Sequence, residues 1–196
     1  MSALLEILAG SLGRGAVQQI SSKLGLNADT TGRIVQAALP ILVSALARNS
    51  SSPQGASALQ TALNKDHDGS VLDDVLGFLG SSAQGPGAGI LRHVLGAEQP
   101  TVQSTIGQAA GVDGAQAGQV LEMLAPLVMG ALGKKTAQEG LDAGGLSQFL
   151  QGEAQAVQQP RADLMGSILG MLDQNKDGNV VDDVGSLLGK LLNNRS

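Results

Sequence analysis

The fold class is decided by residues 27–46, NADTTGRIVQAALPILVSAL, and by a similar stretch at residues 113–132, DGAQAGQVLEMLAPLVMGAL. Each begins with asparagine or aspartate, residue types that favour the N-cap of a helix. Apolar residues then recur at intervals of three and four positions, the spacing of one helix face. We therefore predict two long helices. Each contains a proline, Pro40 or Pro126, which removes one amide donor and is expected to kink its helix.

The composition extends the helical prediction to the whole chain. Of the 196 residues, 42% are hydrophobic, yet there is no tryptophan or tyrosine and there are only two phenylalanines. The core must therefore consist of leucine, valine, isoleucine, alanine and methionine, which suit close packing of helices. No stretch shows the alternation of apolar and polar residues that is typical of a strand. We predict an all-α fold.

Charge and cysteine content exclude several functions. The formal net charge is −5, and no basic patch with interleaved aromatic residues is present to bind phosphates, so we expect no nucleic-acid binding. The chain has no cysteine, which excludes disulfides, thiol catalysis and thiolate metal sites.

The sequence also predicts an internal duplication. When the sequence is shifted by 86 residues against itself, the first half of the chain aligns with its middle. Two tandem copies of one helical module account for this similarity. We predict two tandem helical repeats, residues 1–84 and 85–196, with a glycine-rich linker at their boundary. Identical residues coincide at Leu5 and Leu91, Gly10 and Gly96, Ile20 and Ile106, Gly25 and Gly111, and Pro40 and Pro126.

Each predicted repeat contains one acidic stretch, residues 64–74, NKDHDGSVLDD, and residues 173–183, DQNKDGNVVDD. They are 109 residues apart rather than 86, so the second repeat holds 23 additional residues between positions 134 and 161. Both stretches place oxygen-bearing side chains at positions 1, 3 and 5, glycine at position 6 and aspartates at positions 10 and 11. Helices are expected on both sides, at about 56–63 and 73–79 and at about 162–172 and 182–192.

This spacing favours a hard cation, because alternate side chains turn toward one centre and the glycine allows a sharp bend. We predict that both stretches bind Ca²⁺ in helix–loop–helix elements similar to EF-hand or dockerin loops. Position 12 is valine instead of the usual glutamate, so an aspartate at position 10 or 11, or a water molecule, must complete the shell. The alternative is that these are aspartate-rich helix-capping turns. The candidate ligands are Asn64, Asp66, Asp68, Ser70, Asp73 and Asp74 in the first stretch, and Asp173, Asn175, Asp177, Asn179, Asp182 and Asp183 in the second.

Neither a signal peptide nor a membrane span is expected. Residues 1–8 lack a basic region and contain an acid within their apolar run. The longest apolar runs, residues 37–47 and 123–133, are about half the roughly 20 residues that a transmembrane helix needs. The compartment stays open: cytoplasmic by default, with extracellular after non-classical export as the alternative.

Three segments resemble the YidB-like family of bacterial proteins, a domain of unknown function. They are ILRHVLG at residues 90–96, LAPLVMGALG at residues 124–133 and the acidic stretch at residues 173–183. The resemblance covers most of residues 90–192, with a more degenerate copy in residues 1–80. It implies an all-helical fold and a bacterial origin, and it carries no catalytic residues over to this chain.

No motif predicts an enzyme, since the serines lack a nucleophile elbow and the glycine-rich segments lack a preceding strand. We expect a calcium-binding structural protein that associates with itself, head to tail, into filaments or fibres, because the two repeats are similar but not identical. The terminal helices, residues 3–12 and 184–192, are the expected assembly surfaces. A cytosolic calcium-responsive adaptor that binds a protein partner through an apolar helix face is the alternative, and an uncharacterised hydrolase is a third hypothesis.

Overall fold

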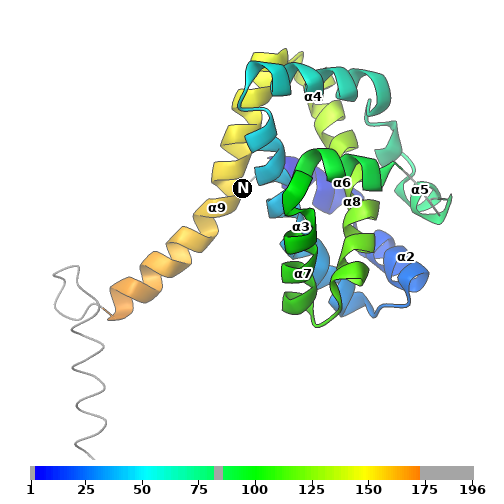
Figure 1. The fold of residues 1–196 in the computed structure, drawn as a ribbon, viewed down its shortest axis with the longest axis vertical. Coiled ribbons are helices and arrows are strands. Elements are labelled where there is room, and N and C mark those ends of the chain that lie inside the picture. Colours follow the sequence, from blue (N-terminus) through cyan, green and yellow to red (C-terminus); the bar gives the residue numbers. More distant parts are fainter. Residues whose placement is uncertain (1–2, 82–85, 173–196) are drawn as a thin grey trace, which may run out of the picture. The chain divides into compact units, whose positions relative to one another are not determined.

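The computed structural model describes residues 3–81 and 86–172, with side chains through residue 157. It divides into two compact units, Met1–Val157 and Gln158–Ser196. Within the described residues all regular structure is helical, so the predicted all-α class is confirmed (Figure 1). In the first half the elements are α1 (Ala3–Ser11), α2 (Arg14–Leu24), α3 (Ala28–Asn49), α4 (Pro53–Asp66), the 3₁₀ helix η1 (Ser70–Leu72) and α5 (Val75–Ser81). They are followed by α6 (Gly87–Leu95), the 3₁₀ helix η2 (Gly96–Glu98), α7 (Gln99–Ala110), α8 (Gly114–Glu139) and α9 (Ala143–Leu172).

The two long helices predicted from the sequence are α3 and α8. Asn27 caps α3, because its side-chain oxygen accepts a hydrogen bond from the backbone amide of Thr30 at 2.7 Å. Asp113 caps α8 in the same way, with the amide of Gln116 at 2.7 Å. Both helices continue across their internal prolines.

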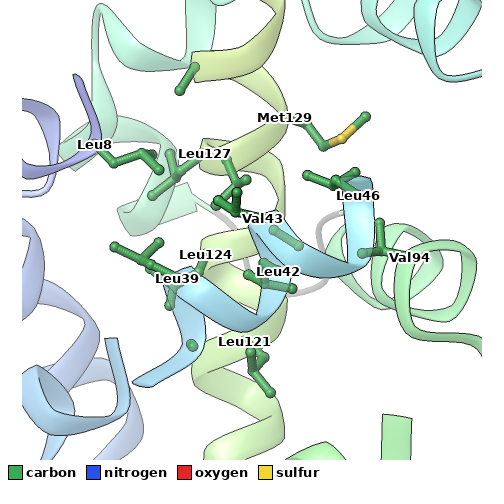
Figure 2. Close-up of a cluster of buried hydrophobic side chains, with 14 of the residues drawn as sticks. Leu8, Leu39, Leu42, Val43, Leu46, Val94, Leu121, Leu124, Leu127 and Met129 are labelled. Atoms are coloured by element: carbon green, nitrogen blue, oxygen red, sulfur yellow. The ribbon is translucent and has the colours of Figure 1, made fainter. Parts of the chain in front are cut away.

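The core forms where these two helices pack together. Helix α8 contacts α1, α3, α6 and α7, and α3 contacts α6 and α7. Figure 2 shows Leu42 and Val43 of α3 among Leu121, Leu124 and Leu127 of α8. Both predicted repeats therefore contribute to one core within the unit Met1–Val157, while their predicted boundary falls among residues 82–85, outside the described part.

Helix ends in the two halves recur at the predicted shift of 86 residues. Helix α3 begins at residue 28 and α8 at residue 114. The preceding helices end at Gly25 and Gly111, both in the left-handed conformation with φ of 65° and 78°. These positions agree with the alignment, and the duplication itself stays a prediction.

Helix α9 differs from the sequence prediction, which placed a helix only at residues 162–172. It begins at Ala143, where the Asp142 carboxylate accepts a hydrogen bond from the amide of Gly145 at 2.8 Å. Leu146 and Leu150 are fully buried and recur at helical spacing, so the helix begins within the 23 additional residues, where none was predicted.

Helix α1 is not the exposed assembly surface that we expected from its apolar sequence. Leu4 and Leu8 are 0% exposed and pack into the core, where α1 contacts α8. Nine residues of helix thus complete the core of their own chain. The other expected surface, residues 184–192, lies outside the described residues.

Helices α3 and α8 are each long and apolar enough to cross a bilayer by length and composition alone. In the most apolar window of each, 56% of α3 and 72% of α8 is buried inside the protein. Core helices of soluble proteins pass the same test, so the expectation of no membrane span stays a prediction.

Candidate functional site

The first acidic stretch lies between α4 and α5. Helix α4 continues through Asp66, so Asn64 and Asp66 occupy its last turn, and His67 follows as the C-cap. Gly69 has φ of 97°, the left-handed conformation that the sharp turn was expected to require. The chain then forms η1, which begins at Ser70.

Two aspartates of the stretch bond to nearby backbone. The Asp68 side chain accepts a hydrogen bond from the amide of Ser70 at 3.0 Å, and hydrogen bonding by Ser70 lowers the pKa of this carboxyl. The Asp74 side chain accepts a hydrogen bond from the amide of Gly77 at 2.8 Å. This second bond caps the start of α5, a role that the capping alternative predicted.

The remaining candidate ligands are exposed. Asp73 pairs with Lys134 of α8 at 3.3 Å, and Asn64, Asp66 and Ser70 lie on the surface. All six candidates of the second stretch lie outside the described residues. They are Asp173, Asn175, Asp177, Asn179, Asp182 and Asp183.

Glycines allow this loop to pack against the C-terminal half of α8. A Cβ at Gly133 would overlap the carbonyl oxygen of His67. A Cβ at Gly69 would lie 2.7 Å from the Cβ of Lys134. Each glycine therefore permits a backbone approach that any side chain would prevent. The loop is fixed to the core by contacts between residues that are more than sixty positions apart in sequence.

A pocket of about 340 Å³ opens beside the loop and is lined by Asp66, Asp68, Ser70 and Asp74, among other residues. His67 also lines it, and partial burial lowers the pKa of its imidazole while the charge of Asp66 opposes that shift. Across residues 3–81 and 86–157 no group of three or more histidines, aspartates and glutamates is arranged to hold a metal ion. The described loop thus brings three carboxylates to one pocket without closing them around a centre.

A larger groove, of about 540 Å³, lies between α4 and α6, each of which packs against α8 (Figure 1). Its lining is mostly apolar, and Pro86 borders both the groove and the acidic pocket. Leu46, Val94 and Met129 lie together on one side of the core cluster in Figure 2. The lining residues are Leu46, Asn49, Gly55, Ala58, Leu59, Pro86, Gly89, Ile90, His93, Val94 and Met129.

Polar contacts at the end of α3 hold the walls of this groove. The side-chain amide of Asn49 donates hydrogen bonds to the carbonyls of His93, at 3.2 Å, and Val94, at 2.9 Å. These carbonyls belong to the last turn of α6, where no amide within the helix is available to them. Arg48 forms a two-pronged ion pair with Glu98 of η2, and this pair lowers the pKa of Glu98. The two halves of the chain are thus joined beside the groove.

Sequence reasoning missed one buried charged residue, Glu153 of α9. It is only 7% exposed, and its carboxylate accepts hydrogen bonds from the amides of Ala3, at 3.1 Å, and Leu4, at 2.8 Å. These are free amides of the first turn of α1, so Glu153 caps a helix about 150 positions away in sequence. The one signal available was a lone glutamate among apolar residues on a helical face.

Comparison with known proteins yields one match. Residues 6–135, well over half of the 196, match the family described as "Bacterial protein of unknown function (DUF937)". The match runs from α1 into α8, so it covers more of the first half and less of the second than the resemblance to YidB-like proteins implied, and it stops before the acidic stretch at residues 173–183. No curated protein and no solved structure matches the chain. The chain therefore belongs to DUF937, a bacterial family of unknown function.

Proposed function

We propose that this chain is a non-catalytic structural module that associates with itself by binding an apolar helical segment. The observation that carries the proposal is the groove of about 540 Å³ between α4 and α6. An apolar groove between helices commonly binds the apolar face of another helix. Asn49 ties the end of α3 to α6 on one side of this groove, which supports a surface that is partly preformed before a partner arrives.

The burial of Leu4 and Leu8 moves the proposed contact away from α1. The groove would bind a different surface of the next molecule. A contact between two different surfaces is heterologous, and such contacts close into rings or extend as filaments. The same groove is compatible with the adaptor hypothesis, in which the helix comes from another protein.

Light scattering on the purified chain separates these two functions. Self-association predicts a mass that rises above 19.7 kDa as the protein concentration increases. An adaptor predicts a mass of 19.7 kDa at every concentration and a complex only with its partner. The second result would contradict the proposed function.

Calcium binding is a second proposed function, favoured by the pocket of about 340 Å³ beside Asp66, Asp68 and Asp74. Because these carboxylates do not close around one centre, we expect weak affinity, with a Kd of about 10⁻⁴ to 10⁻³ M. The second stretch also has four aspartates, so we expect comparable affinity there. Calorimetric titration with calcium tests both points. The matched variants Asp68→Asn and Asp177→Asn remove one charge from position 5 of each stretch, and each is expected to weaken calcium binding at its own stretch by a similar factor. A heat signal no larger than that of buffer, at millimolar calcium, would refute this proposal.

A further inference from the structure

The groove and the acidic pocket share a wall at Pro86, so an apolar surface leads directly to a negatively charged one. The apolar part is lined by Leu59, Ile90 and Met129. Asp66, Asp68 and Asp74 border the pocket and are exposed. A complementary ligand therefore needs an apolar helical face followed by basic residues.

The chain itself contains one segment with this chemistry, residues 184–195, VGSLLGKLLNNR. Its leucines occupy positions 187, 188, 191 and 192, which fall on one face if the segment is helical, as the sequence predicts. Its only charged residues are Lys190 and Arg195. A basic apolar segment therefore matches an acidic apolar groove.

We propose that the groove between α4 and α6 binds residues 184–195 of a second copy of this chain, with the leucines in the apolar part and the basic side chains toward Asp66 and Asp68. This inference rests on the proposed self-association and names the two surfaces that meet. The groove and the segment are different parts of the chain. When two copies bind, one copy therefore keeps a free groove and the other keeps a free segment. The contact is therefore head to tail, and it either closes into a ring or extends as a filament.

Two single-site variants test the contact from its two sides. Ala58→Lys places a bulky cation in the groove at an exposed position of α4, where it does not disturb the core. Leu188→Lys places a cation on the apolar face of the segment. Each variant alone is expected to remain at monomer mass in sedimentation velocity. An equimolar mixture is expected to form a dimer of twice that mass and nothing larger, because only one intact groove and one intact segment remain to meet.

The control Gln18→Lys adds the same charge at an exposed position of α2, and we expect it to associate like the wild type. Circular dichroism melts of all variants establish that they fold. If the wild type associates while both variants associate equally well, the assigned contact is wrong and self-association proceeds through another surface. If the wild type is a monomer throughout, the proposed function fails together with this inference.

A peptide of residues 184–196, which holds Lys190 and Arg195 and no acidic side chain, tests specificity. Titrated against the full-length Leu188→Lys chain, whose groove is intact, the labelled peptide is expected to bind and to lose at least tenfold in affinity when Ala58→Lys is added. A scrambled peptide of the same composition is the control. Equal binding of the scrambled peptide would show that the groove accepts any apolar basic peptide and would overturn the assignment of this segment. A peptide with Lys190→Glu is expected to bind more weakly to the Leu188→Lys chain and to regain affinity when Asp66→Lys is added to that chain.

Discussion

At the scale of single residues, the fold depends on contacts that sequence spacing cannot reveal. Glu153 caps α1 from about 150 positions away in sequence. Gly133 has no side chain, so the backbone of His67 can pack directly against it. Helix N-caps were predictable because their partners lie three residues further on, as for Asn27 and Asp113. The partners of Glu153 and Gly133 become neighbours only when the bundle forms.

Replacing Glu153 is expected to destabilise the protein, because the buried amide of Leu4 and the partly buried amide of Ala3 lose a charged acceptor. Hydrogen bonds to charged groups contribute about 1.5–3 kcal/mol, so Glu153→Ala should lower the free energy of unfolding by about 2–3 kcal/mol. Glu153→Gln keeps one acceptor oxygen and should cost less. The control Glu139→Gln breaks an i,i+4 ion pair with Lys135 and should cost less than about 0.5 kcal/mol. Urea unfolding measures the free energy of unfolding of all three variants. Equal decreases for Glu153→Gln and Glu139→Gln would contradict the capping role.

Replacing Gly133 with alanine is expected to push the acidic loop away from α8, because the added Cβ overlaps the His67 carbonyl. Overpacking of this kind costs about 1–3 kcal/mol. Gly152→Ala in α9 is the matched control, since a Cβ there meets nothing within 4 Å. That substitution should stabilise the protein by up to about 1 kcal/mol through helix propensity. If both variants have wild-type stability in urea unfolding, the loop does not pack on α8 as described.

Because of His67, we expect the free energy of unfolding to fall on mild acidification. Partial burial lowers the pKa of its imidazole in the folded protein, whereas the unfolded chain titrates at about 6.5. The unfolded state therefore binds the proton more readily, and the free energy of unfolding falls as the pH decreases through about 6.5 toward the folded pKa. His67→Gln should flatten this slope, and His93→Gln, at an exposed position, should retain it. Unfolding measured between pH 5 and 8 checks the difference, and an unchanged slope in His67→Gln would argue against burial as its cause.

At the scale of elements, regular helices were predictable and their lengths were not. Helices α3 and α8 follow from caps and apolar spacing. The start of α9 was not predicted, although the Asp142 cap and the leucines that follow at helical spacing mark it. The acidic stretch was expected to wrap around a cation, which stays a prediction, and the first stretch also caps α5 and packs on α8. The glycine and aspartates of the stretch predicted the turn. Its packing against α8 could not be predicted, because it depends on residues far away in sequence.

Helix α1 is expected to stabilise the monomer and not to mediate assembly. Leu8→Ala should lower the free energy of unfolding by about 2–5 kcal/mol, the usual cost of removing a fully buried leucine. Thermal unfolding of the variant beside Leu5→Ala, at a partly buried position of the same helix, measures the effect. A Leu8→Ala protein with wild-type stability but reduced association would return α1 to the role of an assembly surface.

At the scale of the whole molecule, both predicted repeats contribute to one core within the unit Met1–Val157, and the proposed function depends on the groove beside this core. One predicted repeat supplies α4 and the other α6, so the groove exists only because these two parts pack together. Both DUF937 membership and the all-α fold are compatible with many functions. The function must therefore be argued from this surface and its chemistry.

Sedimentation velocity of the wild-type chain beside Ala58→Lys, at concentrations from micromolar to millimolar, tests the central claim most directly. Self-association through the groove predicts that the wild-type mass rises well above 19.7 kDa with concentration. Ala58→Lys, equally folded by circular dichroism, is expected to remain at that mass. Identical masses for the two proteins at every concentration would contradict the account.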